Sequence, residues 1–204
     1  MAGSDSRQEV ALARDLIAGV PGAFDRFVDV FRSKIFHYAV MVCGQREDAE
    51  EVAQDTLLKA FSNFGQLREP ERVKAWLFRI ARNECLMRRR RSVFAPTQEI
   101  SLDELLPHQE DGRKLEIADW SALPEDQALR AELRETVHAA IQGLPEIYKA
   151  VMMLRDIEEL STEETAEVLD ISIEAVKTRL HRARLAVRQK LDEYMRGAKA
   201  GGRR

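Results

Sequence analysis

The fold class follows from residues 161–184, which read STEETAEVLDISIEAVKTRLHRAR. Ser161 followed three residues later by Glu164 has the form of a capping box, a signal that starts a helix. After the first helical pattern, residues 170–172 leave room only for a tight turn, and Ser172 can cap the next helix through its hydroxyl group. Two helices joined by about three residues, the second long and basic, predict a helix-turn-helix unit.

The helix after that turn, expected over residues 173–195, has an apolar face and a basic face. The apolar face predicts packing onto the preceding helices and consists of Val176, Leu180, Ala183, Val187, Leu191 and Tyr194. The opposite face presents Lys177, Thr178, His181, Arg182 and Leu185, flanked by Arg179, Arg184 and Arg188. A lone basic helix is more often a solvated surface, but the capped partner helix and the tight turn favour insertion into a DNA major groove.

Helical periodicity extends over nearly the whole chain, and no run alternates with a period of two for long enough to predict a strand. We therefore expect an all-α protein with helices at residues 8–18, 23–42, 46–64, 70–91, 125–142, 145–156, 162–169 and 173–195. Between residues 92 and 124 the periodicity weakens and three prolines interrupt it, which predicts a flexible linker. The expected organisation is two small helical domains, 1–91 and 125–195, joined by the linker 92–124 and followed by a basic tail, 196–204.

The net charge of −3 over 204 residues hides a strong segregation of charge. Residues 79–91 contain six Arg and one Glu, whereas residues 92–124 contain seven acidic residues and two basic ones. Residues 177–204 contain ten Lys and Arg against two acidic residues. Two basic units on either side of an acidic connector suggest two contacts with nucleic acid and a middle segment that avoids it.

Several other classes of protein fit this composition poorly. No stretch approaches the roughly 18 apolar residues of a membrane helix, and acidic residues interrupt the N-terminus where a signal peptide needs an apolar core. We expect a cytoplasmic protein without membrane insertion. The two cysteines, Cys43 and Cys85, lack metal-ligand spacing and are interpreted as buried thiols, with a redox switch as the minor alternative. Without a glycine-rich phosphate loop or clustered His and Cys ligands, we expect no catalytic residue, no metal and no cofactor.

Residues 48–61 read DAEEVAQDTLLKAF and form two helical stripes. One is an ordinary core stripe, composed of Ala49, Val52, Ala53, Leu57, Ala60 and Phe61. The second is acidic with one apolar residue, and its members at i, i+3, i+4 and i+7 are Glu51, Gln54, Asp55 and Leu58. Such a stripe is either a plain surface or a docking face for a partner helix, and the stripe alone does not decide between them.

Residues 73–91 also divide into two faces. Trp76, Leu77, Ile80 and Ala81 are expected on the core side, where a lone Trp is usually found. The other side carries Arg79, Arg82, Asn83, Leu86 and Arg90. These cations could follow a phosphate backbone while the Asn side chain hydrogen-bonds a base.

These three blocks, in this order, resemble a bacterial sigma factor of the extracytoplasmic-function (ECF) class of the sigma-70 family, over residues 23–91 and 125–191. Residues 48–61 are similar to region 2.2 of that family, and residues 75–83 with the following Arg run are similar to regions 2.3 and 2.4. Residues 144–191 resemble region 4. The resemblance implies a non-enzymatic transcription initiation factor that binds core RNA polymerase, through the β′ clamp helices and the β subunit, and promoter DNA. It also implies control by a separate anti-sigma factor.

Position by position, the resemblance assigns site residues. It implies that Glu51, Gln54, Asp55 and Leu58 bind polymerase, and that Arg79, Arg82, Asn83 and Arg90 bind the minus-10 element. The loop 64–72 matches the loop that captures a flipped base. Lys177, His181 and Arg182 match minus-35 base contacts, and Arg155, Ser172, Thr178 and Arg184 match positions that mostly hold phosphates.

The sequence departs from the family pattern at Glu174 and Ala175, where many relatives have Gly-Thr. The added carboxylate would repel phosphates, so the promoter sequence is not predicted. The main rival class is a helix-turn-helix repressor or activator whose N-terminal half dimerises or senses a ligand. That class accounts for residues 162–188, but it leaves the acidic stripe beside Leu58 unexplained.

Overall fold

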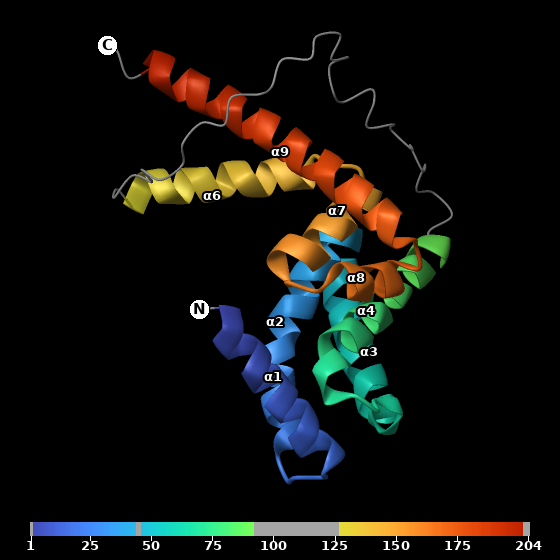
Figure 1. Cartoon of the computed structure of the whole chain (residues 1–204). Helices are drawn as coiled ribbons and strands as arrows, with labels where there is room; N and C mark the ends of the chain where they lie inside the picture. The colour runs from blue at the N-terminus through green and yellow to red at the C-terminus, as the bar shows by residue number, and fades with distance from the viewer. Residues whose placement is uncertain (1, 44–45, 92–126, 202–204) are drawn as a thin grey trace. The chain divides into compact units, whose positions relative to one another are not determined.

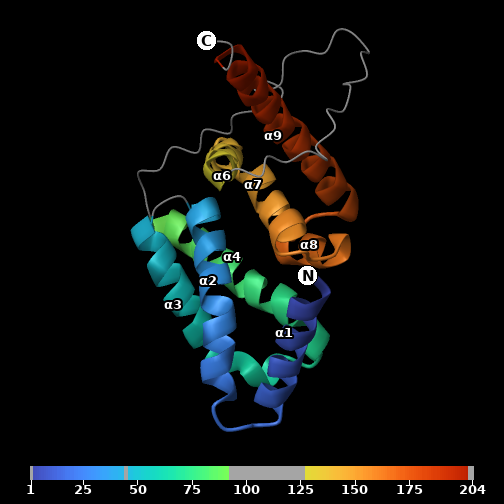
Figure 2. The same cartoon turned by 90° about the vertical axis from the view of Figure 1, so that its left-hand side faces the viewer.

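The computed structural model describes residues 2–43, 46–91 and 127–201. Every regular element in these ranges is helical, which confirms the predicted all-α class. Figures 1 and 2 label these helices. The chain divides into two compact units. Among the described residues, 2–43, 46–91 and 150–178 belong to the first unit, and 127–149 and 179–201 belong to the second. The predicted linker, residues 92–124, lies wholly outside the described residues.

Four α-helices build the N-terminal part of the first unit. They are α1 (Ala2–Ile17), α2 (Ala23–Cys43), α3 (Arg46–Asn63) and α4 (Val73–Arg91), with 3-10 turns η1 (Phe64–Gln66) and η2 (Pro70–Arg72) between α3 and α4. Helix α2 contacts each of the other three. Its residues Phe27, Phe31, Ile35 and Tyr38 recur three or four positions apart and are fully buried, which places one continuous apolar stripe in the core.

Buried ion pairs hold α4 in place. The carboxylate of Glu9 on α1 is buried and accepts a hydrogen bond from Lys34 on α2 at 2.6 Å, and Lys74 on α4 lies 3.5 Å from it. Lys59 on α3 donates to the buried Glu84 on α4. A buried charge without a partner is costly, so these pairs favour one arrangement of the four helices.

The first unit also contains most of the helix-turn-helix. Helix α7 (Glu146–Met152) continues into a π-helical turn, η3 (Met153–Ile157), and is followed by α8 (Thr162–Leu169) and α9 (Ile173–Gly201). The capping box is present, because Ser161 Oγ accepts from the Glu164 amide at 3.0 Å and Glu164 accepts from the Ser161 amide at 2.7 Å. Asp170 ends α8 in the left-handed conformation, with φ of 51°.

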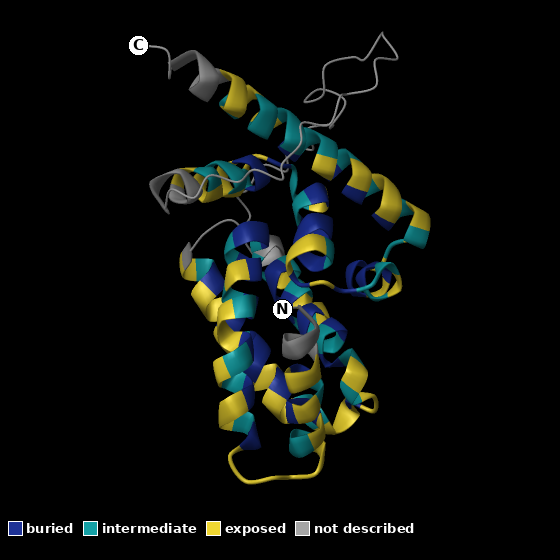
Figure 3. Cartoon of the chain, turned by 60° about the vertical axis from the view of Figure 1, so that its left-hand side comes forward, coloured by how far each residue is buried: buried dark blue, intermediate teal, exposed yellow. Residues whose placement is uncertain are grey.

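In the second unit, helix α6 (Gln127–Gln142) and the longer part of α9 are described. Figure 3 shows that the helices of the chain carry buried and exposed stripes along their lengths. None of the helices in the described ranges is long and apolar enough to cross a membrane.

Helix boundaries differ from the predicted ones mainly at the chain ends. Helix α8 has the predicted bounds, but α1 begins six residues earlier than predicted, at Ala2, and α9 runs to Gly201 instead of ending at Met195. Apolar periodicity marks only the part of a helix that packs, so polar extensions at the ends of α1 and α9 carry no signal.

The interpretation of the two cysteines as thiols was wrong, because Cys43 and Cys85 form a disulfide in the structure. Cys85 is buried and Cys43 is half-buried. Their Cα atoms lie 5.5 Å apart, a separation that suits a disulfide. The residues are 42 positions apart on α2 and α4, and the sequence pattern did not indicate that these two helix segments are adjacent.

Candidate functional site

The acidic stripe on α3 faces solvent. Its opposite face is packed, since Ala49, Val52, Ala53, Leu57 and Ala60 are all buried, as predicted. Glu51 and Gln54 are exposed, Asp55 is half-buried, and the Leu58 side chain is 64% exposed despite its apolar character. The core of the first unit therefore does not require these four residues, and they are available for a partner.

Phe61 was predicted to belong to the core stripe of α3, and this prediction was wrong, because Phe61 is 62% exposed. Its ring lies edge-on to Phe24 of α2, with centroids 4.7 Å apart. It lies one turn beyond Leu58 near the end of α3, and the contact with Phe24 leaves most of it exposed. Leu58 and Phe61 together form an exposed apolar patch beside the acidic stripe.

Arg88 on α4 reaches across to the acidic stripe. Its guanidinium donates to Glu51, donates to Asp55 at 3.0 Å and lies 3.8 Å from Asp48. Partial burial disfavours the charge on Arg88, but the hydrogen bonds that Arg88 donates to Glu51 and Asp55 outweigh that effect and raise its pKa. Sequence reasoning did not single out Arg88, because it is the first of four consecutive arginines.

A second set of predicted residues lies on one side of α4. Arg79 and Asn83 are exposed one helical turn apart, and Arg82 is half-buried beside them. Arg90 belongs to the same helix, but its side chain lies outside the described residues. Leu77, Phe78 and Ala81 are buried, so Arg79 and Asn83 lie away from the packed side of the helix.

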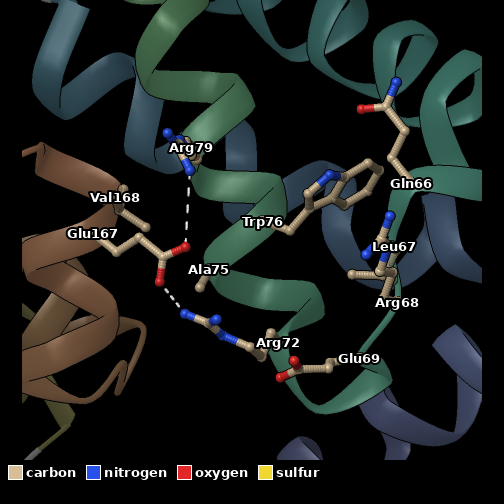
Figure 4. A pocket seen from close by; sticks show the side chains of 10 residues that line it. All are labelled: Gln66, Leu67, Arg68, Glu69, Arg72, Ala75, Trp76, Arg79, Glu167 and Val168. Carbon is tan, nitrogen blue, oxygen red and sulfur yellow. Dashed lines mark hydrogen bonds and ion pairs between the residues drawn. The ribbon is translucent and has the colours of Figure 1, made fainter.

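A hollow of about 180 Å³ lies next to Arg79 (Figure 4). Trp76, expected in the core, is only half-buried and contributes to its wall. The Trp76 ring meets Phe64 edge-on, with centroids 5.5 Å apart. The complete lining is Gln66, Leu67, Arg68, Glu69, Arg72, Ala75, Trp76, Arg79, Glu167 and Val168.

One carboxylate bridges two of the cations that line the hollow. Glu167 of α8 accepts a hydrogen bond from Arg72 and lies 3.8 Å from Arg79 (Figure 4). The Arg79 side chain is 59% exposed, so this ion pair is well solvated and of low strength. The guanidinium group of Arg79 could therefore exchange Glu167 for a phosphate at little cost.

The basic face of α9 is accessible, and most of its predicted apolar face is packed, although Leu191 and Tyr194 are only half-buried. Lys177, Thr178, His181 and Arg184 are exposed and Arg182 is half-buried. The apolar face is buried at Val176, Leu180, Ala183 and Val187. A long helix with a packed back and a basic front can enter a major groove and contact base edges and phosphates.

Arg155 and Ser172 have structural partners within the helix-turn-helix. Arg155, half-buried in η3, donates to the carbonyl of Leu160. Ser172 Oγ accepts from the Ala175 amide at 3.1 Å and so caps α9, as predicted. A hydroxyl group that accepts one hydrogen bond can still donate another, so Ser172 keeps a proton for a phosphate oxygen.

Two segments of the chain match described families. Residues 27–93 match Sigma-70 region 2 and residues 134–187 match Sigma-70, region 4. The chain is 32% identical over 175 residues to the ECF RNA polymerase sigma factor SigW of Bacillus subtilis, covering 85% of this chain and 91% of that protein. It is 31% identical to the RNA polymerase sigma-H factor of Pseudomonas aeruginosa, covering 94% of this chain and 97% of that protein. The chain belongs to the ECF sigma factors of the sigma-70 family.

Solved structures share the fold of this ECF sigma factor. CnrH, solved in complex with the cytosolic domain of CnrY, is 25% identical with a TM-score of 0.58 and covers 91% of this chain and 97% of its own. The fold also matches the sigma factor RpoE of Bartonella quintana, solved in complex with the anti-sigma factor NepR, at 22% identity, a TM-score of 0.58, and coverage of 84% of this chain and 98% of that one.

The family defines the activity of the chain in general terms. This ECF sigma factor is a non-enzymatic transcription initiation factor that directs RNA polymerase to promoter DNA. The region 2 match contains the acidic stripe on α3 and the predicted residues of α4. The region 4 match contains Arg155 and the basic face of α9 at residues 177–184.

Proposed function

We propose that this sigma factor binds core polymerase through Glu51, Gln54, Asp55 and Leu58 on α3. The exposure of Leu58 carries the proposal, because an apolar side chain in an acidic, solvent-facing stripe has no role in the core of its own unit. The clamp helices of the β′ subunit are the proposed partner of the stripe, with further contacts to the β subunit. An apolar contact surrounded by carboxylates suits a helical partner that carries cations.

The proposed role of α4 is to bind and open the minus-10 element. Arg79 and Arg82, with Arg90 further along the helix, would hold phosphates, while Asn83 offers two donors and one acceptor to an exposed base. The hollow beside Trp76 supports this role, because an aromatic wall and nearby guanidinium groups suit a base that has left the stack.

The proposed role of α9 is to read the minus-35 element in duplex form. Lys177, His181 and Arg182 would contact base edges, and the remaining four residues would hold phosphates: Arg155, Ser172, Thr178 and Arg184. Glu174 in the first turn of α9 opposes close approach of a phosphate there, so the backbone contact at that point would be looser than in relatives with Gly-Thr.

The proposed organisation has a polymerase-binding and minus-10 domain at residues 1–91, a linker at 92–124, a minus-35 domain at 125–195 and a basic tail at 196–204. DNA would repel the acidic linker, which could instead enter a basic channel of the polymerase. We place the protein in the cytoplasm with its polymerase. Control by an anti-sigma factor is part of this proposal, and it is supported by the fold shared with the sigma factor RpoE, which was solved with the anti-sigma factor NepR bound.

Run-off transcription with purified core polymerase tests this function. Core polymerase alone should give no specific transcript from the cognate promoter, and addition of the purified chain should give one. A chain that bound the promoter duplex as a dimer without polymerase, and gave no transcript with it, would fit a repressor and contradict the proposal.

A further inference from the structure

Arg88 connects α4 to three carboxylates of a single neighbouring helix. Asp48, Glu51 and Asp55 are spaced at i, i+3 and i+7 along α3 and so lie on one face. The Arg88 guanidinium donates through Nη1 to Glu51 and through Nη2 to Asp55 at 3.0 Å, and Nη1 also lies 3.8 Å from Asp48. One cation therefore contacts the acidic members of the proposed polymerase-docking stripe.

The exposed fraction of the Arg88 side chain differs from that of its carboxylate partners. The Arg88 side chain is only 20% exposed, whereas Glu51 and Asp55 are 63% and 44% exposed. The guanidinium is thus largely covered where it meets the two carboxylates, whereas much of each carboxylate side chain still faces solvent. A planar guanidinium presents its donors at fixed angles, so it restricts the carboxylate rotamers more than an ammonium group does.

These ion pairs contribute little to folding. Much of the Glu51 and Asp55 side chains is exposed, and ion pairs with exposed partners add only a small amount to stability. Helices α3 and α4 are already joined through Lys59 and Glu84, and the disulfide between Cys43 and Cys85 ties α4 to α2. With three carboxylates around one guanidinium, the cluster keeps an excess of negative charge. Glu51 and Asp55 therefore remain attractive to a cationic partner while their directions are restricted.

We propose that Arg88 is a positioning residue of the polymerase-docking surface, which holds Glu51 and Asp55 in the orientation that a basic helix of core polymerase meets. The proposal rests on the proposed function of the stripe. Fewer free rotamers in the unbound protein reduce the entropy that binding must remove, so Arg88 strengthens association without contacting the partner. Arg88 thus differs in function from the DNA-binding arginines proposed on the same helix.

Titration of full-length variants against core polymerase tests the role of Arg88. Arg88→Gln should weaken binding about three- to tenfold, the size expected when contacting charged residues are coupled. Arg88→Lys keeps the positive charge but not the planar guanidinium with its paired donors. Its affinity for core polymerase should lie between that of Arg88→Gln and that of the parent. Arg32→Gln, on an exposed position of α2, controls for the loss of one positive charge and should bind like the parent. Thermal unfolding and circular dichroism accompany each titration.

A double variant and a triple variant separate the docking role of the acidic stripe from the positioning role of Arg88. Glu51→Gln combined with Asp55→Gln should weaken core binding, and adding Arg88→Gln to that double variant should cost less than about 1.5-fold more. If the double variant bound normally, the docking stripe itself would be wrong. If the double variant bound weakly while Arg88→Gln bound normally or more tightly, only the positioning role would be wrong. Arg88→Gln could also reduce the affinity for core polymerase equally in the parent and in the double variant. That result would overturn the positioning role, because the effect would then not depend on these carboxylates.

Discussion

His181 and Arg184 lie three residues apart on α9, and both are exposed, yet their expected contributions to recognition differ. A base-edge contact discriminates between sequences, whereas a phosphate contact is the same on every sequence. His181→Ala or Arg182→Ala should therefore weaken and relax minus-35 recognition, at a cost of about 1–3 kcal/mol where a base contact is lost. Arg184→Ala should weaken binding evenly across sequences.

A library of promoters with randomised minus-35 elements measures this difference. The parent and the three variants are each bound to the library as polymerase holoenzyme, and the selected sequences are compared. An unchanged preference in all three variants would mean that α9 reads DNA through other residues. A relaxed sequence preference in Arg184→Ala would instead indicate a base contact and contradict its assignment as a phosphate contact.

At the scale of single elements, a capping box stabilises the start of α8. Ser161 and Glu164 satisfy each other's backbone amides at the start of α8, an eight-residue helix with few hydrogen bonds of its own. Loss of an N-cap hydroxyl costs about 1 kcal/mol. Ser161→Ala should lower the free energy of unfolding by that amount, measured by denaturant titration, with Ser33→Ala on an exposed position of α2 as the control. Equal stability of the two variants would contradict the capping contribution.

Local signals predicted local structure well. The capping box and the Asp170 turn gave the bounds of α8, and the four-residue recurrence on α9 identified Val176, Leu180 and Ala183 as buried. These features depend on residues within one or two turns of each other. Periodicity is less informative at the ends of elements, which explains why Phe61 was expected in the core although it is exposed.

Contacts between helices could not be predicted in the same way. The pairing of Arg88 with Glu51 joins positions 37 residues apart, and the disulfide joins positions 42 apart. Either contact depends on how α2, α3 and α4 pack, and no periodic signal in one helix specifies the rotation of its neighbour. Trp76 is a similar case. Its spacing along α4 is the same whether its side chain lies in the core or, as here, half-buried in the wall of a hollow.

For the whole molecule, the segregation of charge agrees with two separate contacts with one promoter. The side of α4 that carries Arg79 and Asn83 and the basic face of α9 belong to different family matches, and buried residues lie behind each of them. Duplex recognition at minus-35 and strand opening at minus-10 should therefore be separable by mutation. A substitution on α4 should leave minus-35 recognition intact, and a substitution on α9 should leave strand opening intact.

Asn83 is the residue that best separates the two steps, since it is exposed on α4 one turn from Arg79 and carries no charge. An Asn side chain can hydrogen-bond the edge of an exposed base, whereas Arg79 supplies a phosphate contact that any sequence satisfies. Asn83→Ala should leave polymerase assembly and the closed complex unchanged but lower the yield of open complex. The measurement is permanganate reactivity of unpaired thymines near the start site.

A premelted promoter bubble provides the matched control for Asn83→Ala. Unstacking a base costs a few kcal/mol, and a bubble removes that cost before the protein binds. The variant should therefore recover much of its transcription on the bubble template, while a variant defective in polymerase binding, such as Glu51→Gln with Asp55→Gln, should not. If Asn83→Ala opened duplex promoters like the parent, or if it remained equally defective on the bubble, Asn83 would have no part in melting.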